Sequence, residues 1–486
     1  MSNYVIRDTA CLFDPATGQW VGVIDSNGAE HVVVPPGGKV VTSSTSAQGV
    51  VISAGDSTFG IKSAYPDTPF GGVPVGATNS QYPDAMYTTV ICGTSINRWK
   101  ANRPSAQLRI VCISQQSGVH APSTDVTVKA SIEVDNKTGI NSGDRILASW
   151  GGRETGAVSP FSIITSDPIN APVVKDQYFW TRVFSAGWHQ PYKFKNLPVP
   201  AWGEGGNHVA GDVGADLTET GTMTPNTKGA YGPLTVVGDD GIGYPYVVID
   251  GDSNSNGTGD DPGANPTGRG FMHRLLGSEI PFLNKSFDGR QALADHTSQR
   301  ILCRGATDVF FNLGINDTSS NVGNKLPSIV KPAMLAEWKE LRKMCGPLTH
   351  IWQMDLPPNT TSADAWATVD GQTPLASEAN RLEMNAWIND GCPLTPSLDL
   401  AAPGAVGAIR AGRRVNGVFV PGDEAHPLFA TFSIAEHLTG FKANGDAVWK
   451  AGFAYPTDNL GIHLSGAGCA AAAVGLEWIK QYFGRR

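Results

Sequence analysis

YVVIDGDSN, residues 246–254, decides how the second half of this 486-residue chain folds. An apolar, β-branched run is followed at once by Gly, Asp, Ser and Asn, which is the pattern of a short buried strand that ends in a polar loop. The pattern recurs in DVFFNLG (308–314) and THIWQMD (349–355). Helical periodicity separates and follows these runs. Strands that alternate with helices predict a parallel sheet with helices on both faces, and the functional site of such a fold lies at the carboxyl ends of the strands.

Three stretches after residue 330 have helical periodicity. Residues 332–345 stop at Gly346-Pro347 and place one apolar face together: Leu335, Trp338, Leu341 and Cys345. Residues 375–390 follow the same pattern. Near the C-terminus, Ser465 is a candidate N-cap for a helix whose apolar stripe would be Ala471, Val474, Trp478 and Tyr482.

The first half of the chain predicts β-structure. Residues 1–38 read as a short β module, because GVIDSNGAEHVVV (22–34) places Asn27-Gly28 between two apolar stretches, the signal of a hairpin, and PPGG (35–38) marks a boundary. Residues 39–239 contain short β-branched runs between turn residues, which favours a sandwich or jelly-roll-like domain. We expect this β-rich domain to bind carbohydrate or to shape the substrate site, and residues 240–486 to form a separate α/β domain.

Composition excludes several classes of protein. The formal net charge is −8, and no Lys/Arg-rich run is present, so nucleic acid is not an expected partner. No apolar run approaches the ~18 residues of a membrane helix, and the N-terminus lacks the regions of a signal peptide. We therefore expect a soluble protein, either cytoplasmic or associated with a virion. The 7 Cys are scattered without a CxxC pair, which predicts buried free thiols and neither a disulfide framework nor a zinc site.

Four loop residues carry candidate chemistry. Ser253, directly after the 246–250 strand, would be exposed at the sheet edge, and its own N–H would help to bind an oxyanion. Gly289 ends the segment NKSFDG (284–289), where a glycine lets the backbone approach a reacting carbonyl. Asn316, in GIND (314–317), offers a neutral amide, while Asp317 would fix the loop. His463, in GIHLS (461–465), would accept the proton of the serine.

Each of these motifs has a plain structural alternative. A second GDS, at residues 55–57, is interpreted as a turn because nothing catalytic follows it at a useful spacing. Gly289 alone suits an ordinary turn, and GIND alone suits the end of a strand. The order Ser, Gly, Asn and His along the chain is what favours a catalytic interpretation.

Residues 240–486 resemble the SGNH-hydrolase superfamily, also called GDSL esterases, whose blocks supply Ser253, Gly289, Asn316 and His463 in that order. The resemblance implies a three-layer α/β/α fold and hydrolysis of carboxylic esters without a cofactor or metal. It further implies that the oxyanion hole consists of the Ser253 N–H, the Gly289 N–H and the Asn316 amide.

The sequence departs from the family pattern at one position. The family has an Asp three residues before the catalytic His, and Leu460 stands there. Asp458, five residues before, would orient His463 if the loop bulges. Asp423 and His426 have the DxxH spacing but lack the helix start that follows, and a Ser–His dyad is a further alternative. The departure also leaves open a non-catalytic structural or glycan-binding protein whose SGNH domain has decayed.

The resemblance favours O-acetyl groups of a carbohydrate as substrate. Aromatic residues between Phe179 and Trp202 would stack on sugar rings or else form the core of a sandwich.

The opening segment, residues 5–31, resembles short modules at the start of phage tail and prophage proteins. This resemblance suggests a virion-associated deacetylase. It is also compatible with a homo-oligomer, although no heptads support one. The run from Asp252 to Gly257 matches the first half of an EF-hand, but Gly263 stands where the bidentate Glu would be.

Overall fold

The computed structural model describes most of residues 91–483, except 115–124, 135–143, 160–161, 187–194, 197–199, 208, 211–213, 227–229, 232, 239–244, 261–268 and 278. Before residue 91 it describes only residues 5–8, 11–14, 19–24, 30–32, 73–75 and 81–82. The chain forms two compact units, residues 1–64 and 65–486. Among the described residues, no helix combines the length and the apolar character needed to cross a membrane.

The first unit contains an antiparallel sheet in the order β1 (Val5–Asp8), β2 (Cys11–Asp14), β3 (Gln19–Ile24) and β4 (Glu30–Val32). Strands β3 and β4 pair with Gly22 opposite Val32 and Ile24 opposite Glu30. This is the pairing that Asn27-Gly28 predicts, although the turn itself lies outside the described residues.

Residues 73–238 contain antiparallel sheets. The larger one follows the order β10 (Arg145–Leu147), β9 (Val126–Val134), β13 (Tyr178–Ala186), β7 (Ile91–Lys100) and β15 (Gly205–Gly206). A second follows β12 (Ser162–Thr165), β8 (Leu108–Ser114), β18 (Thr235–Gly238) and β5 (Val73–Pro74). One hydrophobic cluster contains residues of both, among them Trp99, Phe179, Ile110 and Val236. The two sheets therefore pack on a common core.

A parallel sheet forms the centre of residues 245–483. Its strands lie in the order β20 (Phe282–Asn284), β19 (Val247–Gly251), β21 (Asp308–Asn312), β22 (His350–Met354) and β27 (Ala430–Phe432). The parallel sheet expected from the sequence is confirmed. Because the chain runs from β19 first to β20 and then to β21 on the other side, the order reverses at β19. Ligands of open α/β sheets bind at the carboxyl ends of the strands beside such a reversal.

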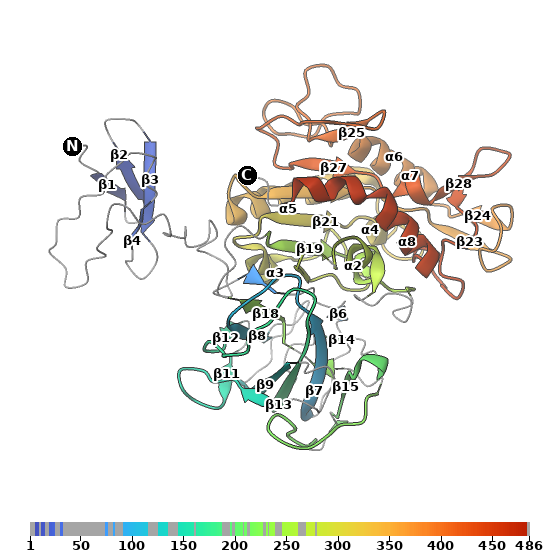
Figure 1. Cartoon of the computed structure of the whole chain (residues 1–486). Helices are drawn as coiled ribbons and strands as arrows, with labels where there is room; N and C mark the ends of the chain where they lie inside the picture. Colours follow the sequence, from blue (N-terminus) through green and yellow to red (C-terminus); the bar gives the residue numbers. More distant parts are fainter. Residues whose placement is uncertain are drawn as a thin grey trace. The chain divides into compact units, whose positions relative to one another are not determined.

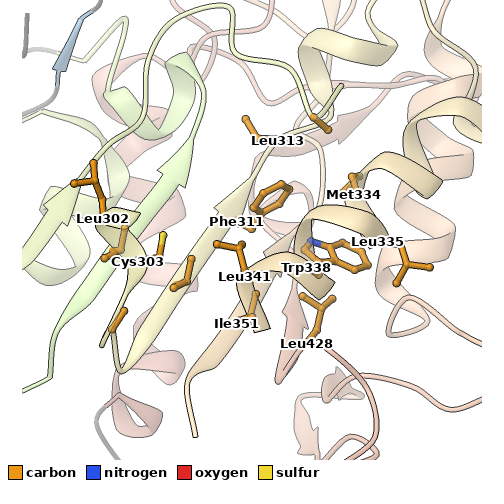
Figure 2. Close-up of a cluster of buried hydrophobic side chains, with 14 of the residues drawn as sticks. Leu302, Cys303, Phe311, Leu313, Met334, Leu335, Trp338, Leu341, Ile351 and Leu428 are labelled. Atoms are coloured by element: carbon orange, nitrogen blue, oxygen red, sulfur yellow. The ribbon is translucent and has the colours of Figure 1, made fainter. Parts of the chain in front are cut away.

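Alternate residues of the central strands enter two different hydrophobic clusters. Val248, Val309 and Phe311 belong to one cluster, together with Trp338 of α5 (Pro327–Cys345). Figure 2 shows part of this cluster, where Phe311 and Ile351 of the sheet lie beside Leu341 and Trp338 of the helix. Val247, Ile249 and Phe310 belong to the other cluster. Figure 1 shows helices on both sides of the sheet, as this alternation requires.

In the described part of residues 245–483, the α-helices are α1 (Ser253–Asn256), α2 (Gly270–Leu276), α3 (Thr297–Arg300), α4 (Ile315–Thr318), α5, α6 (Glu378–Asn389), α7 (Ala435–Leu438) and α8 (Gly466–Gly475). Two 3₁₀ helices, η3 (Ile301–Cys303) and η4 (Glu477–Tyr482), follow α3 and α8. Ser465 caps α8 as expected, since its Oγ accepts a hydrogen bond from Gly468 N–H at 3.2 Å. The predicted stripe is partly wrong. Trp478 and Tyr482 pack against the core, but Val474 is 75% exposed, and the buried residues of α8 are Gly468, Cys469, Ala472 and Ala473.

The domain boundaries expected after residues 38 and 239 stay predictions. Val111 and Val237 of the β-rich part lie in the same hydrophobic cluster as Val248 of the parallel sheet. In addition, the Asn102 amide donates to the Gly277 carbonyl at 3.0 Å. The β-rich part and the α/β part therefore share a core within one compact unit.

Candidate active site

Ser253 is the first residue of α1, directly beyond the carboxyl end of β19. The preceding Asp252 is the N-cap, and its carboxylate accepts a hydrogen bond from Asn254 N–H at 2.9 Å. The N–H groups of a first helical turn have no partner within the helix, so the serine carries a donor of its own beside its hydroxyl. The expectation that Ser253 is exposed at the sheet edge is wrong, because the residue is 1% exposed at the start of a helix packed between neighbouring loops.

His463 reaches this serine from the loop that precedes α8. Its Nε2 lies 2.9 Å from Ser253 Oγ, and its Nδ1 lies 3.1 Å from Asp458 Oδ1. With the Nδ1 proton directed at the carboxylate, Nε2 is left to accept the hydroxyl proton. Serine, imidazole and carboxylate thus form one continuous chain of polar contacts, the arrangement that makes a hydroxyl nucleophilic.

The spacing of five residues between Asp458 and His463 is accommodated by a tight loop. The Asp458 carboxylate accepts hydrogen bonds from three backbone N–H groups, those of Leu460 at 2.9 Å, Ile462 at 2.7 Å and His463 at 2.8 Å. Gly461 has a φ of +65°, and an added Cβ would collide with the Thr360 carbonyl. The loop therefore wraps around the carboxylate, while Leu460 packs against the core.

Gly289 lies in the turn that follows β20. It has a φ of +74°, and an added Cβ would meet nothing within 4 Å, so its backbone borders open space. Neighbouring Asp288 ties this turn to the serine's helix, because its carboxylate accepts hydrogen bonds from Asn256 Nδ2 and Thr258 Oγ1, each at 2.9 Å. Phe287 N–H also donates to the Gly251 carbonyl at 3.2 Å.

Asn316 is in α4, just beyond the carboxyl end of β21, and is 1% exposed. Its Nδ2 donates to the Arg290 carbonyl at 3.0 Å, which joins it to the Gly289 turn. Asp317 does what the sequence predicts of it: its carboxylate accepts hydrogen bonds from Ala292 N–H at 2.8 Å and Leu293 N–H at 3.1 Å. The four motif loops therefore lie side by side at one edge of the sheet.

The charges around His463 set its protonation. Burial opposes the imidazolium and by itself would lower the pKa of His463. The hydrogen bond and the charge of Asp458 outweigh burial and raise this pKa above its ordinary value, and the charges of Asp288 and Asp252 add smaller contributions. Burial alone would raise the pKa of Asp458, but contact with His463 lowers it. Burial raises the pKa of Asp252 to about 7. The sequence motifs did not single out Asp288, although it lies within the SFDG segment.

His426, the alternative base, lies elsewhere. It precedes β27 and so sits toward the amino end of the sheet, opposite the edge that carries Ser253. Its Nδ1 accepts a hydrogen bond from Leu428 N–H at 3.1 Å, and its Nε2 lies 2.9 Å from the Cys392 carbonyl oxygen, which it reaches as a donor. The structure does not bring His426 to the serine.

Several other sequence expectations fall partly outside the described residues. The second GDS motif, at residues 55–57, lies outside them, as do Trp188, His189 and Tyr192 of the aromatic segment and Gly263 of the EF-hand-like run. Phe179 and Trp180 are buried, at 0% and 5% exposure, which is the arrangement of core residues. The cysteines at positions 112, 303, 345, 392 and 469 are free thiols, as expected.

No family model matches the sequence, and the search of curated proteins found no match. Among solved structures, the chain is similar to a carbohydrate acetylesterase family member from Sinorhizobium meliloti, with 16% identity and a TM-score of 0.27 over 49% of this chain and 98% of that chain. It is similar to a GDSL-like lipase from Parabacteroides merdae, with 14% identity and a TM-score of 0.26 over 49% and 94%. An active-site mutant of a family two carbohydrate esterase from Clostridium thermocellum gives 12% identity and a TM-score of 0.28 over 84% and 98%. By their names, these similar structures are two carbohydrate esterases and a GDSL-like lipase, and at TM-scores below 0.5 they carry no conclusion about this chain.

Proposed function

We propose that this chain is a serine hydrolase of carboxylic esters, with Ser253 as nucleophile, His463 as general base and Asp458 as the carboxylate that orients the base. The observation that carries the proposal is the pair of contacts of the imidazole, 2.9 Å from Nε2 to Ser253 Oγ and 3.1 Å from Nδ1 to Asp458 Oδ1. This geometry matches the requirement that base and nucleophile lie within hydrogen-bond reach while a third group fixes the base.

In the proposed reaction, Ser253 Oγ attacks the ester carbonyl while His463 Nε2 takes its proton. The resulting oxyanion accepts hydrogen bonds from Ser253 N–H, Gly289 N–H and the Asn316 amide, donors whose individual removal typically costs about 3 kcal/mol of transition-state stabilisation. His463 then protonates the leaving alcohol. A water molecule, deprotonated by the same imidazole, hydrolyses the acyl-enzyme and restores the serine.

The substrate we propose is an O-acetyl ester of a carbohydrate. The surroundings of the nucleophile favour a polar substrate, because Asp252, Asn254 and Asn256 are all buried there. Within the described part of the chain, neither amide atom of Asn254 has a hydrogen-bond partner. A hydroxyl-rich alcohol would supply such partners, whereas a long acyl chain would not. Action on a host-surface glycan by a virion-associated protein remains a hypothesis that rests on the resemblance of residues 5–31.

The non-catalytic alternative depended on Leu460 at the position of the family's Asp. In the structure a different carboxylate contacts the imidazole, so Leu460 no longer favours a decayed site. If the alternative held, the wild-type chain itself would fail to hydrolyse p-nitrophenyl acetate in the test below.

The test is hydrolysis of p-nitrophenyl acetate by Ser253→Ala, with Ser57→Ala as matched control. Both substitutions remove a hydroxyl from a GDS motif, and Ser253 lies 2.9 Å from His463 Nε2. We expect Ser253→Ala to lower kcat by roughly 10⁴-fold or more and Ser57→Ala to leave it unchanged. Wild-type turnover by Ser253→Ala would show that the nucleophile is misassigned.

A further inference from the structure

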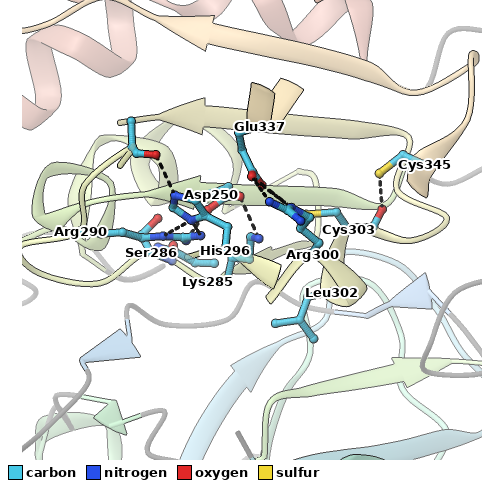
Figure 3. A network of polar contacts seen from close by, with 12 residues as sticks. Asp250, Lys285, Ser286, Arg290, His296, Arg300, Leu302, Cys303, Glu337 and Cys345 are labelled. Atoms are coloured by element: carbon cyan, nitrogen blue, oxygen red, sulfur yellow. Dashed lines mark hydrogen bonds and ion pairs between the residues drawn. The ribbon is translucent and has the colours of Figure 1, made fainter. Parts of the chain in front are cut away.

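A buried ion cluster lies behind the proposed active site. Asp250, three residues before Ser253, has a fully buried carboxylate that contacts Lys285 Nζ at 2.8 Å and forms an ion pair with Arg290 Nη1. Both cations come from the segment that follows β20, the one that contains Gly289. Figure 3 shows Lys285 and Arg290 converging on Asp250. Two cationic side chains thus share one carboxylate at the end of β19.

His296 fixes the remaining side of the Arg290 guanidinium. Nε of Arg290 donates to His296 Nδ1 at 3.2 Å, and Nη2 lies 2.6 Å from the same atom. This assigns the proton of the ring to Nε2, which faces the Ala292 carbonyl at 3.4 Å. Burial, followed by the charge of Arg290, lowers the pKa of His296 to about 4, so the ring is a neutral acceptor near pH 7. The guanidinium is therefore held between an anion and a neutral ring.

The backbone of Arg290 joins the two loops that would bind the oxyanion. Its peptide nitrogen is bonded to Gly289, and its carbonyl oxygen accepts the hydrogen bond from Asn316 Nδ2 at 3.0 Å. An added Cβ at Gly289 would meet nothing within 4 Å, so no side chain packs on this residue from that direction. The turn is held from both sides: Phe287 and Asp288 bond to Gly251 and to α1 before Gly289, and Arg290 is anchored to Asp250 of β19 after it.

We propose that Arg290 is a positioning residue for the oxyanion donors. Its guanidinium is anchored to Asp250. Through its backbone it holds Gly289 N–H, and through its carbonyl it holds the Asn316 amide, at the distance from Ser253 that the transition state requires. This inference rests on the proposed function. A buried ion pair is weak support for stability as such, and a donor displaced by about 1 Å is enough to cost roughly 100-fold in rate.

The chain offers a control for loss of an ion-paired arginine, with a side chain that is 20% exposed against 1% for Arg290. Arg300 pairs with Glu337, with Nη2 2.6 Å and Nε 3.0 Å from the carboxylate, on the same side of the sheet (Figure 3). Among the described residues, no hydrogen bond or ion pair of these two side chains reaches Gly289 or Asn316. Arg300→Met therefore removes an arginine–carboxylate pair and is expected to leave the oxyanion loops as they are.

The experiment compares Arg290→Met with Arg300→Met in the full chain, with kcat expressed per active site titrated by p-nitrophenyl acetate burst. For Arg290→Met we expect kcat to fall about 100-fold, KM to change less than about threefold, and the pH midpoint of kcat/KM to stay in place, because His463 and Asp458 are untouched. Arg300→Met should keep its kcat per site. Equal losses of kcat in both variants, or unchanged kcat in Arg290→Met, would overturn the proposal.

Two further measurements test the positioning role of Arg290 independently. Should Arg290→Met fail to fold, Asp250→Asn preserves side-chain volume while removing the anchoring charge, and it must also lower kcat per site. Crystal structures of wild type and variant give a readout independent of activity: the Gly289 nitrogen is expected to shift by about 1 Å relative to Ser253 Oγ. If the chain proved not to be an esterase, an unmoved Gly289 would still refute the positioning role, and a displaced one would still support it.

Discussion

His463 Nε2 lies 2.9 Å from Ser253 Oγ although 210 residues separate the two positions in the sequence. The serine is held by the end of β19 and the start of α1, whereas the histidine is held by a loop that wraps around Asp458. Contact between two side chains from such distant segments depends on the parallel sheet, which brings the carboxyl ends of its strands to one edge.

Asp458→Asn tests the role of the carboxylate five residues before the histidine. We expect kcat on p-nitrophenyl acetate to fall by roughly 10³–10⁴-fold, because an amide neither stabilises the imidazolium nor fixes its tautomer. Asp423→Asn is the control, since Asp423 precedes His426 at the spacing that the family pattern favours but lies away from Ser253. If Asp423→Asn were the variant that lost activity, the third member would have been assigned to the wrong loop.

The pH dependence follows from the raised pKa of His463. Protonated His463 cannot accept the serine's proton, so activity is lost as the pH falls through this pKa. Because Asp458 raises the pKa of His463, we expect the midpoint of kcat/KM to lie above the ordinary histidine value of about 6.5. In Asp458→Asn, burial remains without the opposing charge, and the midpoint should move to lower pH. A midpoint that rises in this variant would contradict the assignment.

Gly461→Ala tests the fit of the catalytic loop. An alanine there would have to adopt a φ of +65° and place its Cβ against the Thr360 carbonyl. Gly452→Ala is the matched control, because Gly452 has a φ of +74° with nothing within 4 Å of an added Cβ. We expect about 1 kcal/mol of destabilisation in the control from backbone strain alone and roughly 2–4 kcal/mol in Gly461→Ala, measured by urea unfolding. Equal losses would mean that the loop has room to shift.

His463→Gln and His426→Gln compare the two candidate bases directly. His463→Gln should lower kcat by roughly 10⁴-fold or more, whereas His426→Gln should change stability and leave kcat per active site intact. The physical reason is that His426 makes its contacts to Leu428 and Cys392. Retained turnover in His463→Gln would require another base.

The sequence predicts β19, β21 and β22 closely because their apolar β-branched runs are short and are bounded by turn residues, but it gives no strand run for β20 and β27, which are only three residues long. The expected helix, residues 332–345, starts too late: α5 begins at Pro327, where the fixed φ of proline suits a first turn, and Pro332 lies inside the helix. Of the stripe expected near the C-terminus, Trp478 and Tyr482 pack on the core from η4, whereas Val474 is exposed because the buried face of α8 contains Cys469, Ala472 and Ala473.

The sequence also identifies Ser253, Gly289, Asn316 and His463 as neighbours, since each follows a strand or precedes a helix at the same sheet edge. It leaves the carboxylate partner open, because the contact of Asp458 depends on a left-handed glycine at 461 that no spacing rule predicts. The cluster of Asp250, Lys285 and Arg290 is likewise a product of strand register, which pairs Ile249 with Asn284 and thereby sets the following residues side by side.

The most direct test of the central claim is labelling with a fluorophosphonate, followed by mass spectrometry of the peptides. The reagent bonds covalently to a serine whose hydroxyl is activated by a neighbouring base. We predict a single adduct on Ser253, absent in Ser253→Ala and strongly slowed in His463→Gln, with Ser57 unlabelled throughout. An adduct on another residue, or a wild-type chain that remains unlabelled, would contradict the account of this site.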